Sequence, residues 1–267
     1  GEASGMKAGA LYADLETTAI TAGDDGVLRQ FSGEGWERIG QVEAGPYVAI
    51  NRGASHSLWL VKEGLAIQWD VQSEGPRRSL VIPPDVKGIL ETRSGQLFAW
   101  RLNAIYQNSN GTWVTSSASP ASDDEEVNGV IETSRGHLLV SNLTSLTEWE
   151  LTGDGGMKAL NRIKSRQNFR GLIEEADGSF LVGSNEEGLF RYREGTLTLL
   201  VPFEKNPSAR ISCLFRASNR RIWTGALDLG VASNQDGQWI WYGGSLGFTR
   251  GGVSAIAEDP LGQIWAQ

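Results

Sequence analysis

A pattern that recurs about every 41 residues constrains the fold of this chain more than any other feature of its sequence. Each copy holds a small residue, an aliphatic residue, several polar residues with a glycine, and then an apolar pair. The copies are anchored at seven apolar positions, separated by 39, 39, 41, 42, 42 and 42 residues: Ile20, Trp59, Phe98, Leu139, Leu181, Trp223 and Trp265. A fixed period of this length is typical of a repeat architecture, in which every copy folds into the same unit.

Two further positions keep their character in every copy. Ten residues before each anchor stands a small residue: Ala10, Ala49, Gly88, Gly129, Gly171, Cys213 and Ala255. The next residue is always aliphatic: Leu11, Ile50, Ile89, Val130, Leu172, Leu214 and Ile256. The blades of a propeller converge toward one axis, where only small side chains fit between adjacent strands. We therefore expect these two positions on the innermost strand of each blade.

Turn signals divide each repeat into four short segments without a helical period. Glycines three residues before the anchor mark one hairpin at Gly95, Gly136, Gly178 and Gly262. A second hairpin follows the anchor, and a last segment opens on Gly and Trp at 35–36, 111–113 and 237–239. The pattern predicts an all-β fold, a single β-propeller domain over residues 1–267 with about seven four-stranded blades. Because Gln267 stands two residues past the seventh anchor, we expect the last blade to be incomplete or the natural protein to continue.

Composition excludes several classes of function. The formal net charge is −8 and no basic stripe is present, which disfavours nucleic acid as a partner. The one cysteine excludes a disulfide within the chain and a cysteine-based metal cluster. No apolar run reaches 18 residues and no signal peptide is recognisable. We find no P-loop, zinc motif or catalytic triad signature, so neither a cofactor nor a metal is expected.

The last repeats resemble a known family. Residues 253–265 read Val-Ser-Ala-Ile-Ala-Glu-Asp-Pro-Leu-Gly-Gln-Ile-Trp, which is similar to the two-component regulator propeller repeat. Residues 171–178 with 188–189, and 222–225 with 230–231, are similar to the same repeat. The resemblance implies a sensor domain for signal transduction, on the periplasmic or otherwise extracytoplasmic side of a membrane histidine kinase or related regulator. It further implies binding of a ligand, often a glycan fragment, or dimer contacts that signal across the membrane.

Several reactive or aromatic side chains have a structural interpretation. Cys213 occupies the column of small residues, which favours packing over a nucleophilic role. His56 and His137 fall in or beside the turn column, so we expect solvated turn histidines. The acidic runs are expected to be solvated loops rather than calcium sites, and they lie at 24–25, 123–126 and 186–187. The polar stretch 115–126 is expected to be a connection between blades.

Eight of the ten tryptophans fall on repeat positions, which favours core packing over ligand stacking. They are the anchors Trp59, Trp223 and Trp265, the fourth-segment residues Trp36, Trp113 and Trp239, and the equivalent pair Trp69 and Trp149. Trp100 and Trp241 break the pattern and are the better candidates for a surface role.

Ligands of propellers usually meet the face formed by the loops between strands two and three and between successive blades. The repeat places seven candidate ligand-binding residues on that face: Arg101, Asn103, Asn142, Arg170, Asn185, Arg210 and Asp228. Lys87 and Asn128 lie on the approaches between blades. Guanidinium, amide and carboxylate groups can pair with sugar hydroxyls or acidic groups.

Three functions agree with these observations. The first is a non-catalytic sensory propeller that binds a small molecule or glycan, as a homodimer or as part of a longer membrane receptor. The second is a passive scaffold for protein interactions. The third is an enzyme similar to the streptogramin lyases, which requires clustered His and Glu. The two turn histidines argue against the third, so we do not expect an enzyme.

Overall fold

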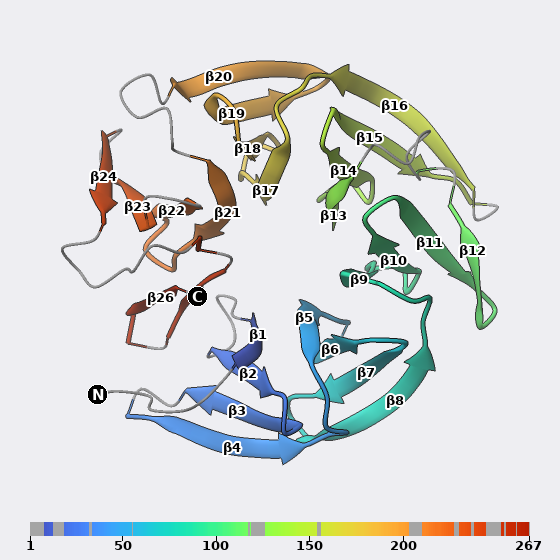
Figure 1. Cartoon of the computed structure of the whole chain (residues 1–267). Helices are drawn as coiled ribbons and strands as arrows, with labels where there is room; N and C mark the ends of the chain where they lie inside the picture. The colour runs from blue at the N-terminus through green and yellow to red at the C-terminus, as the bar shows by residue number, and fades with distance from the viewer. Residues whose placement is uncertain are drawn as a thin grey trace. The chain divides into compact units, whose positions relative to one another are not determined.

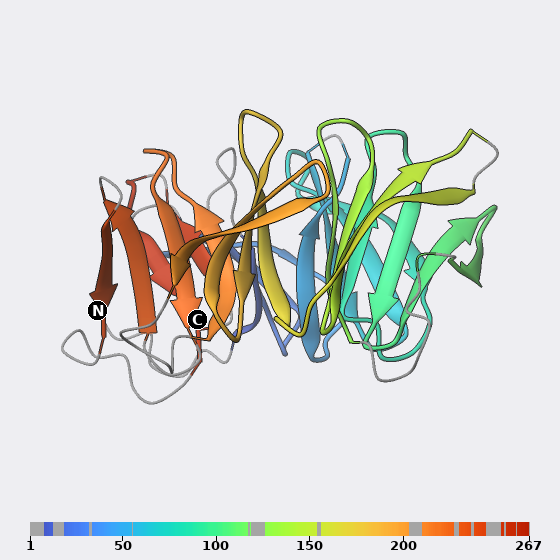
Figure 2. The ribbon, with the colours of Figure 1, turned by 90° about the horizontal axis from the view of Figure 1, so that it is seen from above.

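The computed structural model describes residues 8–12, 19–31, 34–54, 56–116, 118, 126–153, 156–202, 210–226, 230–235, 238–243, 252–253, 255–259 and 261–266. These residues form 26 strands, and no helix long and apolar enough to cross a membrane occurs among them. Strands that are neighbours in a sheet are also neighbours in the chain (Figure 1). They run antiparallel and are joined by hairpin loops at both ends of a sheet (Figure 2).

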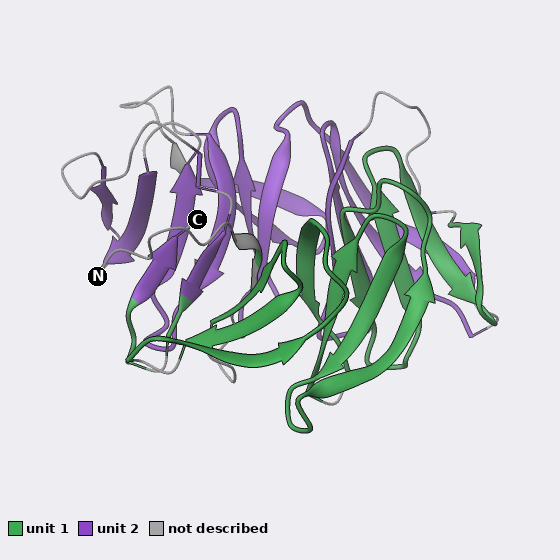
Figure 3. Ribbon diagram, turned by 60° about the horizontal axis from the view of Figure 1, so that its bottom comes forward, with its two compact units in different colours: residues 1–116, 258–263 green, residues 117–257, 264–267 purple. Residues whose placement is uncertain are grey.

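The chain divides into two compact units (Figure 3). The first comprises residues 1–116 and 258–263, and the second comprises residues 117–257 and 264–267. The expectation of one propeller domain over residues 1–267 stays a prediction.

The first unit contains three four-stranded sheets. The first sheet is β1 (Ala8–Tyr12), β2 (Ile20–Gly23), β3 (Val27–Phe31) and β4 (Trp36–Gln41). The second is β5 (Tyr47–Arg52), β6 (Ser57–Lys62), β7 (Leu65–Asp70) and β8 (Gly75–Val81). The third is β9 (Gly88–Glu91), β10 (Leu97–Arg101), β11 (Ala104–Ser109) and β12 (Thr112–Thr115).

The second unit contains the next three four-stranded sheets. The fourth sheet is β13 (Val127–Glu132), β14 (Leu138–Asn142), β15 (Ser145–Leu151) and β16 (Met157–Lys164). The fifth is β17 (Phe169–Glu174), β18 (Phe180–Ser184), β19 (Gly188–Arg193) and β20 (Thr196–Pro202). The sixth is β21 (Ile211–Arg216), β22 (Ile222–Ala226), β23 (Gly230–Gln235) and β24 (Gln238–Tyr242).

The seventh repeat forms a two-stranded sheet of β25 (Ile256–Glu258) and β26 (Ile264–Ala266). The described residues therefore make a β-propeller with six four-stranded blades, and the expected number of about seven is corrected to six. The physical reason is that the 267 residues hold only the first two segments of the seventh repeat.

The seven anchors all lie on the second strand of a sheet, which confirms the repeat alignment. Among these strands, β6 (Ser-Leu-Trp-Leu-Val-Lys), β14 and β18 are buried at every position. The outermost strands β8 and β16 are mostly exposed instead. A short, continuous apolar run suits a strand that is covered on both faces, as these central strands are between neighbouring blades.

The column of small residues lies on or directly before the first strand of each sheet, as predicted. In β1, β5, β13, β17 and β21 the pairing with the second strand shifts register at or just before this column, which marks a β-bulge. At Gly171 the backbone is left-handed (φ 68°), and a Cβ would lie 2.8 Å from the amide nitrogen of Leu214 in β21. Close approach of neighbouring first strands therefore requires glycine there.

Apolar side chains of successive sheets pack against one another within each unit. In the first unit, Leu28 and Ile20 pack with Leu58 and Trp69 of the next sheet. In the second unit, Leu139 and Leu146 share a core with residues such as Phe169. The packing of each blade on the next thus buries surface that a single sheet would expose.

The tryptophans mostly occupy the predicted places. Trp36, Trp113 and Trp239 lie on the outer strands β4, β12 and β24. The aromatic ring of Trp100 lies against Gly88, where a Cβ would come within 2.3 Å of the ring. Trp100 thus fills space over a first strand and is half-buried, as is Trp241.

Candidate functional site

The structure describes six of the seven predicted ligand-binding residues. Arg101 ends β10 and Asn103 lies in the following turn, both in the first unit. In the second unit, Asn142 ends β14, Arg170 is the second residue of β17, Asn185 follows β18, and Arg210 precedes β21. Asp228 lies outside the described residues.

Asn168 joins the predicted residues of the second unit, although the sequence reasoning did not select it. Its backbone N–H donates to the carbonyl oxygen of Leu143 at 2.9 Å, and its carbonyl accepts from the Asn185 N–H at 3.3 Å. Its side-chain Oδ1 accepts from Asn128 Nδ2 at 2.9 Å and from Arg170 Nε at 3.4 Å. Asn168 thereby ties the loops of the fourth and fifth blades together.

The backbone of Asn168 is left-handed, with φ at 46°. Asparagine adopts this conformation more readily than other residues with a Cβ. An asparagine directly before a predicted first strand was therefore a usable signal. We call the group of five residues the Asn168 cluster: Asn128, Asn142, Asn168, Arg170 and Asn185.

Two amide oxygens of this cluster are buried without a hydrogen-bond partner among the described residues, Asn142 Oδ1 and Asn185 Oδ1. Asn142 is only 4% exposed, and its Nδ2 donates to Ser145 Oγ at 3.4 Å. Arg170 uses Nε within the cluster, and its two Nη groups carry further N–H donors. Buried polar groups normally have a protein or water partner, so these two oxygens are open to a donor that reaches them.

Arg210 occupies in the sixth blade the position that Asn168 has in the fifth. Each precedes the first paired residue of its first strand, Ile211 or Phe169. Strand β18 of the fifth blade approaches β21 closely here, because a Cβ on Gly183 would lie 2.3 Å from Ile211. Arg210 is exposed beside this contact.

In the first unit, Arg101 ends its second strand at the position of Asn142 in the second unit. Its guanidinium carbon lies 5.8 Å from the centre of the Tyr106 ring, and its Nε is buried without a partner among the described residues. The equivalent residue of the preceding blade, Lys62, donates to Glu43 Oε1 at 2.7 Å and to the carbonyl oxygen of Ala44. Lys62 is therefore engaged, whereas Arg101 retains donor capacity.

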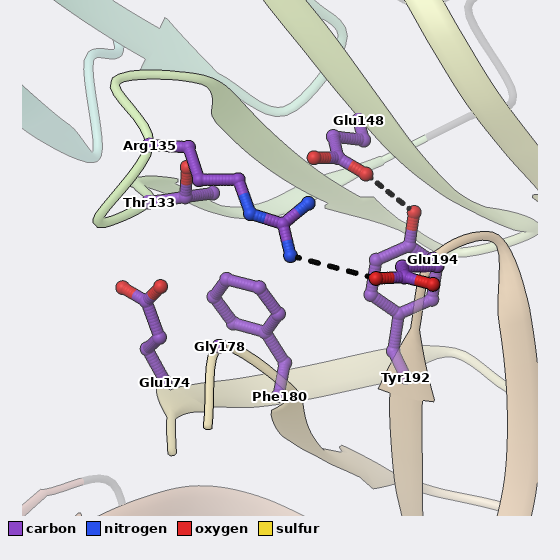
Figure 4. Close-up of a pocket in the computed structure, with 8 residues that line it drawn as sticks. All are labelled: Thr133, Arg135, Glu148, Glu174, Gly178, Phe180, Tyr192 and Glu194. Carbon is purple, nitrogen blue, oxygen red and sulfur yellow. Dashed lines mark hydrogen bonds and ion pairs between the residues drawn. The ribbon is translucent and has the colours of Figure 1, made fainter. Parts of the chain in front are cut away.

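A second polar group surrounds the buried carboxylate of Glu148 on β15 (Figure 4). The hydroxyl of Tyr192 donates to Glu148 Oε2 at 2.8 Å, and Asn161 Nδ2 lies 3.4 Å from the same oxygen. His137 Nδ1 lies 2.9 Å from Glu148 Oε1. Because a carboxylate can only accept, this imidazole nitrogen is the donor. The network joins β15, β16 and the residue directly before β14 in the fourth blade to β19 of the fifth.

The environment of Glu148 favours its ionised form. Burial raises the pKa of this carboxyl, but the hydrogen bonds from His137, Tyr192 and Asn161 together outweigh burial and lower it. Burial and the neighbouring carboxylate raise the pKa of Tyr192, so the phenol stays neutral. The adjoining hollow has a volume of about 10 Å³, room for one water molecule. Arg135 and Glu194 face each other across it at 3.9 Å. A carboxylate this fully paired, beside so small a hollow, serves packing rather than substrate chemistry.

The expectation of two solvated turn histidines is correct for His56 and wrong for His137. His56 is exposed in a turn with a left-handed backbone. The side chain of His137 is 21% exposed and is hydrogen-bonded to Glu148. The reason is that Glu148 is opposite Leu139 in the register of β14 and β15, two residues from His137.

Cys213 and the acidic runs give no sign of chemistry. Burial raises the pKa of Cys213 to about 11, so its thiol is protonated near neutral pH. Asp25 is bonded to Arg29 at 3.0 Å, which lowers its pKa. Residues 123–125 lie outside the described residues. Within the described ranges, no group of three or more His, Cys, Asp or Glu could hold a metal ion.

No protein-family model matches the sequence, and no curated protein matches it either. Solved structures do match. The extracellular domain of the putative hybrid two-component system BT4673 from B. thetaiotaomicron is similar with a TM-score of 0.72 and 15% identity. That of BT3049 from the same organism has a TM-score of 0.68 and 15% identity. The similarity covers 99% and 96% of this chain but only 37% and 38% of those chains.

A lyase has the same fold. A catalytically inactive histidine-to-alanine variant of virginiamycin B lyase from Staphylococcus aureus, with quinupristin, matches with a TM-score of 0.72 and 10% identity. The similarity covers 99% of this chain and 93% of the lyase. The fold is a β-propeller. At these identities the similarity extends to the fold alone, and both extracellular domains of putative two-component systems and a lyase share it.

Proposed function

We propose that this chain is a non-catalytic, ligand-sensing propeller of an extracytoplasmic receptor, and that the Asn168 cluster takes part in binding its ligand. Extracellular domains of two-component systems are among its structural neighbours, which supports a sensory propeller outside the cytoplasm. The same neighbours are longer, which agrees with a role as part of a larger receptor, alone or as a homodimer.

The observation that carries the proposal is the pair of buried, unpartnered amide oxygens on Asn142 and Asn185, in the cluster that holds Arg170. An unsatisfied buried acceptor costs free energy, which a ligand donor recovers. A sugar fragment presents several hydroxyl donors at short spacing and can also accept from the Arg170 guanidinium. A glycan fragment or a similarly hydroxylated small molecule is therefore the ligand class that this chemistry fits best. Arg210 extends the same chemistry to the next blade.

Titration calorimetry with a panel of neutral and acidic oligosaccharides tests this proposal. We expect binding to the wild type, a loss of about tenfold or more in affinity for Arg170→Ala, and a larger loss for the Arg170→Ala, Arg210→Ala double variant. Arg191→Ala is the matched control, since Arg191 is exposed on β19 of the same unit. Equal affinity of the double variant and the wild type, at unchanged melting temperatures, would remove this surface from consideration.

The alternative is a passive scaffold for protein interactions. Exposed apolar side chains on the outer strands favour it, such as Leu199 and Leu200 on β20 and Ile240 on β24. A scaffold predicts partner binding that outer-strand substitutions weaken and that Arg170→Ala leaves intact. Calorimetry with the oligosaccharide panel and a partner-capture assay on the same variants therefore discriminate the two functions.

A further inference from the structure

Arg220 stands at a turn position where four other repeats carry glycine and the second repeat carries His56, which is also left-handed. The turn between first and second strands holds Gly95, Gly136, Gly178 and Gly262, with φ between 76° and 83°. Arg220 takes the same place in the sixth blade, with φ at 67°. Left-handed backbone is unfavourable for a residue with a Cβ, so the side chain is present at an energetic cost that glycine avoids. A strained exposed residue of this kind suggests a functional side chain.

This side chain lines an open hollow of about 300 Å³ at the end of the sixth blade. The wall consists of two guanidinium groups, three carboxamides and one aliphatic side chain: Arg220, Arg221, Asn219, Asn234, Gln235 and Ile222. Arg220 and Arg221 are both exposed, and no described carboxylate forms an ion pair with either. Arg216 on the adjoining β21, by contrast, is paired with Glu175. Two cations thus gather without a counter-ion, in a chain whose net charge is −8.

The Gln235 amide, which lines the hollow, is held in place by neighbouring side chains. Gln235 Nε2 donates to the hydroxyl of Tyr242 at 2.8 Å. The Tyr242 ring in turn stacks on Trp223, with ring centres 5.5 Å apart and planes at 29°. Trp223 directly follows Ile222 in β22. A fixed amide beside two guanidinium groups reduces the ordering cost that a bound ligand has to meet.

We propose that this hollow is a binding site for an oxyanion, the carboxylate or sulfate group of a small acidic ligand. Guanidinium groups present N–H donors in a planar fork that matches such oxygens. The Asn219 amide, whose oxygen accepts from the Arg221 backbone N–H, adds N–H donors beside them. In the sixth blade the hollow lies at the turn that ends β21, whereas Arg210 precedes the same strand. The site is therefore distinct from the Asn168 cluster, and it does not depend on the function proposed for that cluster.

The repeat itself supplies the decisive variant, because Arg220→Gly installs the residue that four other turns carry. Calorimetry and amide-resonance titrations would use sodium sulfate and sodium glucuronate at constant ionic strength, with glucose as the neutral probe. We expect at least one anion to bind the wild type, glucose not to bind at this site, and Arg220→Gly to lose about tenfold or more in affinity. Its melting temperature should be equal or higher, since the turn is relieved. Sulfate binding alone indicates a sulfate-ester ligand, and glucuronate binding alone a carboxylate ligand.

Two further variants separate a built site from general attraction of anions. Arg221→Gln should weaken binding as Arg220→Gly does. Lys158→Gln removes one positive charge from the exposed surface of β16 and should leave the affinity unchanged. Equal binding by wild type and Arg220→Gly, an equal loss in Lys158→Gln, or no binding of either anion would each overturn the proposal.

Discussion

Cys213 stands where the other repeats carry alanine or glycine, and its sulfur lies 3.8 Å from the carbonyl oxygen of Val253. A Cβ added to the opposing Gly225 would come within 2.7 Å of that sulfur. The space around the side chain therefore holds cysteine but little more. Packing, rather than thiol chemistry, explains why a cysteine can stand in this column.

Substitution of Cys213 tests this interpretation. We expect Cys213→Ala to fold and to retain most of its stability, because alanine fills the same place in three other repeats. Cys213→Leu should lower the free energy of unfolding by about 1–3 kcal/mol through overpacking. Urea denaturation of both variants gives the comparison. A leucine variant as stable as the wild type would contradict the packing argument for the whole column.

Glu148 is expected to make stability depend on pH. Its pKa is below the ordinary value of 4.5 in the folded chain, so the folded state favours the ionised form. The stabilisation is fully present above pH 4.5 and is lost as the pH falls through the lowered value. We expect Glu148→Gln to be less stable than the wild type at pH 7, and the difference to shrink below about pH 4.5.

Urea denaturation of both proteins between pH 7 and 3 measures that difference. Glu150→Gln, on the same strand β15, is the matched control and should follow the wild type at every pH. A stability difference for Glu148→Gln that is constant over this range would mean that ionisation of Glu148 contributes nothing.

At the scale of the strands, one carboxylate contact recurs between successive blades. Glu91 Oε2 on β9 accepts from the backbone N–H of Ala54 at 2.9 Å. Both oxygens of Glu174 on β17 accept from the N–H of Ser134, at 3.0 and 2.8 Å. Each glutamate stands seven residues before the anchor of its own repeat. Each N–H belongs to a residue five positions before the anchor of the preceding repeat. Among the described residues, each unit thus contains at least one such cross-blade link.

The two links should differ in strength. Glu91 also accepts from Trp59 Nε1, Gln68 Nε2 and Arg78 Nη2, so Glu91→Ala leaves four donors without this acceptor. We expect a loss of about 3 kcal/mol for Glu91→Ala and about 1 kcal/mol for Glu174→Ala. Glu194→Ala is the control, since that side chain is 68% exposed and should cost almost nothing. Denaturation curves that place Glu174→Ala at or above Glu91→Ala would be inconsistent with this account.

The repeat explains which parts of the structure the sequence could predict. The anchors and the column of small residues recur in seven copies, so equivalent residues occupy equivalent strands in every copy. The order of the strands can therefore be predicted from the repeat. The strand-end positions of Asn142, Arg170 and Asn185 were predictable because loop positions also follow the repeat, while their part in binding stays a prediction. The Glu148 network was not, since Tyr192 reaches it from 44 residues away and no local pattern encodes such a pair. The role of Arg220 became visible only once its backbone angle could be compared with the glycines of the other turns.

At the scale of the whole molecule, length and fold alone do not separate a sensor from a lyase. The chain spans 93% of the matched virginiamycin B lyase but only 37% of the matched BT4673 region. The positions of the histidines agree with the proposed sensory function. His137 is held by Glu148 beside a hollow of about 10 Å³, and His56 is an exposed turn residue. The hollow described near His137 is too small to admit a substrate.

We therefore expect no cleavage of quinupristin by this chain. The chain would be incubated with quinupristin under conditions in which virginiamycin B lyase converts it, and products would be followed by mass spectrometry. The expected spectrum contains only the starting compound at every time point, while the lyase control is converted. If a cleaved product forms, His137→Ala and His56→Gly identify the histidine involved. Loss of the cleaved product in either variant would establish a lyase and refute the non-catalytic function. A contaminating enzyme would instead form the product in both variants.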